Sequence, residues 1–148
     1  MKLHSFSRVA LSFAAAAIVA AALSSCGSDD LLQIDETWTQ QSVDGKVLPD
    51  TVPNSDPVIV ITSGEADINQ NGHYTFTFNG TSDGVPGVVG TDAGTWGISH
   101  ATFFFKSGQP NSDAYIGALT GNTFNVSMPG AVVHSSNPEV HMVFASGP

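Results

Sequence analysis

Cys26 is the residue whose context says most about its chemistry, and it is the only cysteine of the 148-residue chain. Without a second thiol, the chain forms no internal disulfide and no zinc site built from several thiolates. Cys26 follows the small residues Ser24 and Ser25, and these follow an apolar run over residues 9–23 and a positively charged start. This order is typical of a secretory signal, and the apolar run is too short to span a membrane.

The sequence Leu23-Ser24-Ser25-Cys26 at the end of this signal resembles the lipobox of a bacterial lipoprotein precursor. The resemblance implies cleavage before Cys26, attachment of lipid through its sulfur, with acyl chains that label with palmitate, and anchoring to a lipid bilayer of the cell envelope. Gly27 follows, where an Asp would suggest retention at the inner membrane, so the resemblance favours the outer membrane in a source that has one. The alternative is an ordinary secretory signal. We expect a signal peptide over residues 1–25, a tether over residues 26–34 and one domain over residues 35–148.

Four histidines follow Cys26, and a metal site would need two or more of them close in space with a carboxylate. They are spread over a strand start, a junction between strands, a loop and a last strand: His73, His100, His134 and His141. The last two could converge with Glu139, but no spacing requires it. We therefore expect no metal and no cofactor.

Residues for nucleophilic or acid–base catalysis are also dispersed. No serine is expected in a strand-to-helix elbow of the Gly-x-Ser-x-Gly kind, and Glu65 and Asp67 alternate with apolar residues, as on the solvent face of a strand. The carboxylates expected in loops are scattered and lack the pattern of a calcium-binding loop; they are Asp50, Asp56, Asp83 and Asp92. We expect a protein that is not an enzyme.

All 13 acidic residues follow Cys26, whereas Lys46 and Lys106 are the only basic ones there, so the part after the signal carries a formal charge of −11. Such a charge repels nucleic acid and anionic lipid headgroups, and neither is expected as a partner. The absence of arginine after Cys26 removes the usual clamp for phosphates and carboxylates.

The elements that must position any site are strands, because apolar residues after Asp35 recur with a period of two and turn residues interrupt them regularly. We expect eight or nine strands, loops over residues 49–57, 80–90, 107–113 and 129–138, and no helix. This pattern predicts an all-β antiparallel sandwich or barrel, and the sequential hairpins favour an up-and-down barrel of about eight strands over a Greek key. The segments with a strand-like pattern, which need not each be a separate strand, are residues 37–43, 46–48, 58–62, 65–69, 73–78, 94–98, 102–106, 114–119, 123–128 and the segment around Val140, Met142 and Phe144.

The order of features along this domain resembles the small lipocalin-like domains of bacterial lipoproteins, which share a calycin-type β-barrel. The features are Trp38, Val43-Asp44-Gly45-Lys46, the run from Asn71 to Phe76, Gly94-Thr95-Trp96 and a closing hairpin. The chain departs from true lipocalins in having Glu36, not Gly, two positions before Trp38, and in having no arginine to pack across that tryptophan.

The aromatic residues are the remaining indication of function. If the resemblance holds, some of them line a cavity for a small hydrophobic ligand, with Tyr74 and Trp96 as polar groups. The alternative is a filled interior, and a surface or protein-interaction domain that acts through loops 49–57 and 80–90. The candidates to line the cavity are Trp38, Tyr74, Phe76, Phe78, Trp96, Phe124, Val126, Met142 and Phe144.

Overall fold

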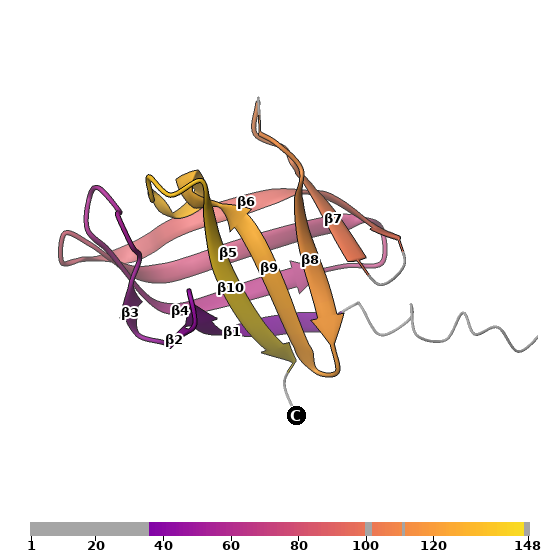
Figure 1. The fold of residues 1–148 in the computed structure, drawn as a ribbon, viewed down its shortest axis with the longest axis horizontal. Coiled ribbons are helices and arrows are strands. Elements are labelled where there is room, and N and C mark those ends of the chain that lie inside the picture. The colour runs from indigo at the N-terminus through magenta and orange to yellow at the C-terminus, as the bar shows by residue number, and fades with distance from the viewer. Residues whose placement is uncertain (1–35, 100–101, 111, 147–148) are drawn as a thin grey trace, which may run out of the picture. The chain divides into compact units, whose positions relative to one another are not determined.

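The computed structural model describes residues 36–99, 102–110 and 112–146, which belong to one compact unit, Ile34–Pro148. The signal, Cys26, the tether and His100 lie outside the described residues. The described residues form strands and one short 3-10 helix (Figure 1). The elements are β1 (Glu36–Val43), β2 (Lys46–Val47), β3 (Asp50–Thr51), β4 (Ile59–Ile68), β5 (His73–Ser82), β6 (Val85–Ser99), β7 (Thr102–Ser107), β8 (Tyr115–Thr120), β9 (Thr123–Pro129), η2 (Gly130–Val133) and β10 (Glu139–Ser146).

Eight of the strands close into an antiparallel barrel. From β4 to β10 each strand pairs with the next one along the chain, and β1 completes the ring by pairing with both β10 and β4. The predicted all-β class and up-and-down order are therefore confirmed. This closed barrel is compatible with a calycin or lipocalin-like fold.

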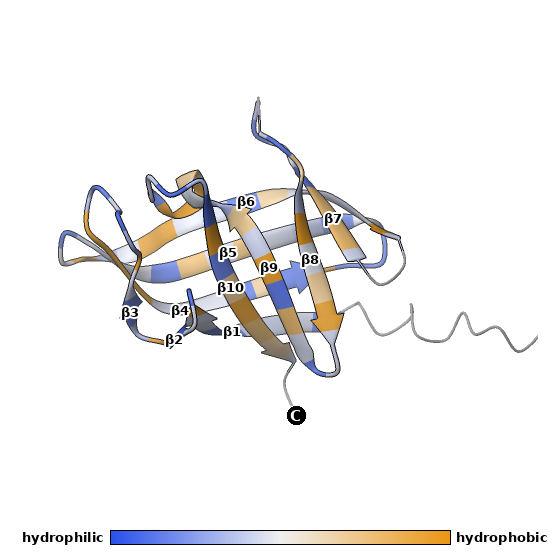
Figure 2. Cartoon of the chain, viewed as in Figure 1, coloured by the Kyte–Doolittle hydropathy of each residue, from blue (hydrophilic) through white to orange (hydrophobic). Residues whose placement is uncertain are grey.

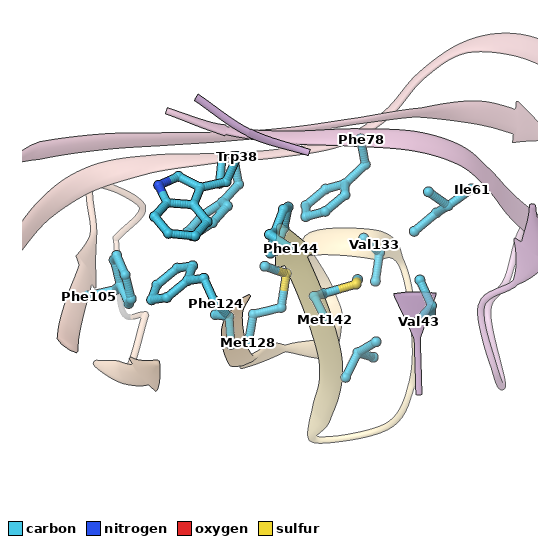
Figure 3. Packing of buried hydrophobic residues seen from close by; sticks show 14 of the residues in the cluster. Trp38, Val43, Ile61, Phe78, Phe105, Phe124, Met128, Val133, Met142 and Phe144 are labelled. Atoms are coloured by element: carbon cyan, nitrogen blue, oxygen red, sulfur yellow. The ribbon is translucent and has the colours of Figure 1, made fainter. Parts of the chain in front are cut away.

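Alternation along the strands produces the interior, as the alternating colours along several strands indicate (Figure 2). In β5, for example, Tyr74, Phe76 and Phe78 are buried, while the intervening residues are exposed or half-buried. Facing walls contribute side chains that point toward one another, such as Phe78, Phe124 and Phe144 (Figure 3). The core thus lies inside the barrel.

Two connecting segments cover one end of the barrel. Ser55 and Ser135 form an isolated β-bridge, and the Ser135 hydroxyl donates to the Pro53 carbonyl at 2.6 Å. The same segments place Val52 and Val133 in the hydrophobic core. The loops predicted over residues 49–57 and 129–138 therefore have more structure than expected, since they contain β3 and η2 respectively.

The prediction of a loop over residues 80–90 is wrong. β5 and β6 pair through this segment, with Ser82 opposite Val85, and the connection is only the turn Asp83-Gly84, both with positive φ. A Cβ on Gly80 would overlap the Val60 carbonyl, so this glycine serves close strand packing rather than loop flexibility.

The two strands predicted over residues 58–62 and 65–69 are a single strand, β4. Its register shifts between Ile61 and Ser63, which is a β-bulge at Thr62. Because the bulge adds one residue, Ile59 and Ile61 before it and Gly64 and Ala66 after it all face the interior. The bulge interrupts the alternation of buried and exposed residues, and for this reason the single strand resembled two strands in the sequence.

Candidate functional site

The aromatic side chains predicted to line a cavity lie in the interior, where they pack against one another. Rings from β5 and β7 contact each other at a centroid separation of 4.9 Å for Tyr74 and Phe105, and rings from β5 and β10 at 5.5 Å for Phe76 and Phe144. Phe124 of β9 lies 5.8 Å from Trp38 of β1. These contacts fill the middle of the barrel with side chains. That the predicted cavity-lining residues bind a ligand stays a prediction. The buried members are Trp38, Tyr74, Phe76, Phe78, Phe124, Val126, Met142 and Phe144; Trp96 is partly buried.

The two polar groups predicted to meet a ligand already have protein partners. The Trp96 indole nitrogen donates to the Asn69 carbonyl at 2.9 Å, which fixes the ring against the turn before β5. The Tyr74 hydroxyl donates to Oδ2 of Asp92 at 2.6 Å. A ligand would therefore have to displace a hydrogen bond to reach either group.

Asp92 is the centre of a buried polar cluster. The residue is only 2% exposed, and its carboxylate accepts three hydrogen bonds from hydroxyl groups. Tyr74 and Tyr115 both donate to Oδ2, at 2.6 and 2.7 Å, and Ser107 donates to Oδ1 at 2.5 Å. Such donors offset the cost of taking a carboxylate out of water.

Four strands bring this cluster together, and Tyr74 is the contribution of β5. Asp92 lies on β6 directly opposite Phe76 of β5, so its side chain points inward with the aromatic residues. Ser107 ends β7 opposite Gly94, and a Cβ at Gly94 would overlap the Lys106 carbonyl, so glycine allows the two strands to approach. Tyr115 opens β8.

Burial raises the pKa of both tyrosines in the cluster. For Tyr74 and for Tyr115 the largest cause is removal from water, which disfavours the phenolate. Their hydrogen bonds to Asp92 also raise the pKa, because each phenol proton is held on an anionic acceptor. Both residues therefore remain neutral donors well above neutral pH.

A pocket of about 490 Å³ lies beside this cluster, and we call it the side pocket. It lies between β6 and the segment containing η2. β7 and β8 are each six residues long, whereas β6 has fifteen residues. The segment that joins β7 to β8 projects from the barrel wall (Figure 1). Twelve residues line the side pocket: Val88, Val89, Gly90, Thr91, Asp92, Ser107, Gln109, Ser112, Pro129, Ala131, Val132 and His134.

Asp92 marks the inner end of the side pocket, because it lines the pocket although it is almost wholly buried. The walls nearer β6 and η2 are largely apolar, with Val88, Val89 and Val132 among them. Gly90 allows η2 to lie directly on β6, since a Cβ there would be 2.5 Å from the Val132 carbonyl oxygen. The arrangement suits a small ligand that is mostly apolar and has one polar group.

The histidines and carboxylates considered for metal binding are not gathered into such a site. His73 and His141 are exposed on strands, and His134 lies in the left-handed region at the end of η2, where it lines the side pocket. Within the described ranges, no three His, Cys, Asp or Glu side chains come together as a metal site. Glu139 instead accepts a hydrogen bond from Ser127.

The strand period could have pointed to Asp92. Asp92, Gly94 and Trp96 alternate along β6, so Asp92 shares its face with a tryptophan predicted to be inside. A carboxylate on an inward-facing side of a strand is unusual and indicates a candidate functional residue. Tyr115 gave a weaker signal, since it opens β8, two places from β6 in the sheet, and its hydroxyl reaches Asp92 across β7.

Comparison of the chain with models of protein families, with curated proteins and with solved structures finds no match. In the part of the chain that the structure describes, no helix has the length and apolar character needed to cross a bilayer.

Proposed function

We propose that this protein is a lipid-anchored β-barrel of the bacterial cell envelope that binds a small, largely apolar ligand without transforming it. The observation that supports this most is the side pocket of about 490 Å³, with apolar walls and Asp92 at its inner end. Its volume is within the range of small-molecule sites, which are mostly apolar and contain few polar groups. The barrel is compatible with a lipocalin-like fold, which the sequence order also resembles.

The side pocket is a better candidate for the ligand than the barrel axis. The rings along the axis are already in contact with one another, and the polar groups of Tyr74 and Trp96 have protein partners. A ligand on the axis would have to separate these rings, whereas the side pocket opens to the surface. The ligand site proposed here is thus displaced from the one expected from the aromatic residues.

Anchoring rests on the sequence around Cys26, which resembles a lipobox. One acyl chain anchors only marginally, but lipoproteins of the type this sequence resembles carry more than one on the cysteine, which would keep the domain at a membrane surface. The outer membrane is the favoured location in a source that has one. The charge of −11 after the signal fits a domain held beside, and not against, an anionic surface.

Titration with a neutral fluorescent dye, phenylnaphthylamine, tests binding to residues 27–148. We expect a saturable rise in fluorescence for the natural sequence and a loss of affinity of about 10-fold or more for Ala131→Phe, whose ring would enter the side pocket. Ala118→Phe is the matched control, because Ala118 is exposed on β8 and does not line this pocket. Unchanged affinity in Ala131→Phe would place the ligand elsewhere.

A non-catalytic interaction domain is the second candidate. It is favoured by the outer face of β7 and β8, where Phe104 and Ile116 lie opposite each other and are 46% and 53% exposed. Adjacent exposed apolar side chains of this size are common in protein interfaces. Absence of any saturable dye binding would favour this alternative.

A further inference from the structure

The carboxylate of Asp92 is buried without a cation. Among the described residues, no basic side chain forms an ion pair with it. The ion pair in this part of the chain joins Lys46 and Asp50 instead. In the described part of the chain, the side chains that donate hydrogen bonds to Asp92 are the neutral hydroxyl groups of Tyr74, Tyr115 and Ser107. Hydroxyl donors lower the cost of burial but leave a full negative charge beside the side pocket.

Counting donors among the described residues, one acceptor position of this carboxylate is still open. A carboxylate offers about four lone-pair positions, and the three hydroxyl groups use two on Oδ2 and one on Oδ1. Tyr74 does not line the side pocket, whereas Ser107 does. Tyr115 does not line it either, so the oxygen that faces the side pocket is taken to be Oδ1, the partner of Ser107 and the one with the free position.

A donor that carries positive charge is the group that this position favours. A charge-assisted hydrogen bond is stronger than a neutral one, and the effect increases where water is excluded. An anionic group would be repelled by Asp92. The net charge of −11 after the signal also raises the local concentration of cations around the domain.

An organic cation fits the surroundings better than a metal ion does. Calcium and magnesium take six or more oxygen ligands, and Asp92 is the only carboxylate that lines the side pocket. The walls formed by Val88, Val89 and Val132 offer contact to an apolar body instead. The remaining polar residues that line it, Thr91, Gln109, Ser112 and His134, are available to other parts of such a molecule.

We infer that the side pocket takes a small ligand with an ammonium group and an apolar body, and that the ammonium donates a hydrogen bond to Oδ1 of Asp92. This inference rests on the proposed function, because it names the class of ligand for the same site. Asp92 provides the charge, and Tyr74, Tyr115 and Ser107 position it. The apolar walls hold the rest of the molecule.

Calorimetric titration of the full lipidated chain in nanodiscs of phosphatidylcholine tests the inference. The probes are phenethylammonium, phenethyl alcohol and hydrocinnamate, which share a phenyl group and differ in the charge of the other end. Empty nanodiscs give the heat of partitioning into lipid. We expect phenethylammonium to bind about 10- to 100-fold more tightly than the alcohol, the fold-change of one charge-assisted hydrogen bond, and hydrocinnamate to bind most weakly.

Two substitutions test the role of Asp92 in this preference. Asp92→Asn removes the charge and should bring the affinities for the ammonium and the alcohol to within about a factor of three of each other. Ser107→Lys places a tethered ammonium beside Oδ1 and should abolish the same preference while Asp92 keeps its charge. Asp67→Asn is the matched control, since it makes the same change in net charge on the outer face of β4 and should keep the preference.

The outcomes separate this inference from the proposed function. If the natural chain binds none of the probes, the proposed function itself fails at this pocket. If it binds the ammonium and the alcohol equally, the pocket binds apolar molecules but the assignment of an ammonium ligand is overturned. Preference that persists in Asp92→Asn, with a near-ultraviolet circular dichroism spectrum like that of the natural chain, also overturns it. If Asp92→Asn does not fold, Ser107→Lys replaces it in the test, and an ammonium preference that persists in Ser107→Lys overturns the inference.

Discussion

At the scale of single residues, the interior contains few polar side chains, and the candidate site is built from one of them. Gln40, Asp92 and Ser135 are the buried polar or charged residues in the described part of the chain. Ser135 ties two loops together, and Gln40 donates to the Ser42 carbonyl at 3.3 Å. Asp92 alone carries charge, and it is also the one that borders the side pocket.

The chain has two tyrosines, Tyr74 and Tyr115, and both should remain un-ionised in the folded protein at pH values where free tyrosine forms phenolate. Their pKa values are raised above the ordinary value of 10.0, so above about pH 10 the unfolded chain releases protons that the folded chain retains. Stability contributed by these groups is therefore complete below pH 10 and decreases as the pH rises. Phenolate absorbance should appear only together with alkaline unfolding.

Tyr115→Phe provides the comparison for that titration. It should halve the phenolate absorbance that accompanies unfolding and reduce the loss of stability per pH unit. A phenolate midpoint near pH 10 in protein that is still folded would contradict the burial of the two phenol groups.

Phe76→Ala should lower the free energy of unfolding by about 3–5 kcal/mol, because a fully buried ring leaves a cavity in the core. Phe104→Ala makes the same chemical change on the outer face of β7 and should cost less than about 1 kcal/mol. Urea denaturation of residues 27–148 measures both. Equal losses would mean that Phe76 is not enclosed by the rings seen around it.

At the scale of the elements, the long hairpin of β5 and β6 forms one wall of the side pocket. β7 pairs with β6 only from Gly94 onward, whereas residues 85–93 of β6 lie between the turn Asp83-Gly84 and that point. The first half of β6 is therefore free to pack against η2. Gly90 is the residue at which this contact is closest. The difference in strand length thus creates the space, and η2 closes one side of it.

Gly90→Ala should destabilise the protein by about 1–3 kcal/mol, since the added methyl group would push η2 away from β6. Gly87→Ala is the control on the same strand; a Cβ there meets no atom within 4 Å, and the change should remain within about 0.5 kcal/mol. Thermal unfolding monitored by circular dichroism compares the two. A Gly90→Ala protein as stable as the control would show that η2 does not rest on β6.

The fold was largely predictable from the sequence, and the candidate site largely was not. Alternation such as that of Tyr74, Phe76 and Phe78 is a local signal, and it identifies strands without knowledge of their partners. Glycines within β5 and β6 gave the wrong signal, because Gly80 and Gly90 serve close packing rather than a loop.

The side pocket depends on contacts between distant segments. Asp92 meets Tyr115 across 23 positions of sequence, and no local pattern in either strand indicates that pairing. The pocket itself follows from the different lengths of β6, β7 and β8 and from the position of η2. Such differences in element length become meaningful only when the strand order is known.

At the scale of the whole molecule, the proposed function assigns location to the lipid on Cys26 and ligand binding to the domain. The domain supplies the pocket, while Cys26 would supply the anchor. An acidic domain on a short tether would stand off from anionic headgroups and leave the pocket open to solvent.

Cys26→Ser should abolish metabolic labelling with palmitate and shift the domain from the membrane fraction to the soluble fraction. The reason is that the thiol is the only acceptor for the lipid that the lipobox implies. Ser28→Ala, two residues further on, is the control and should leave labelling and location unchanged. A natural chain that is cleaved, unlabelled and soluble would contradict lipid anchoring.

The ring of strands has a consequence for the order of assembly. Seven strands, β4 to β10, can form hairpin by hairpin as they become available, because each pairs with its neighbour in the chain. β1 differs, since one of its partners is β10, and the pairing of Trp38 with Ser146 joins opposite ends of the domain. Contacts of such high sequence separation form slowly. β1 can pair with β4 early, but the barrel stays open until β10, the last of the described strands, has been made and has paired with β1.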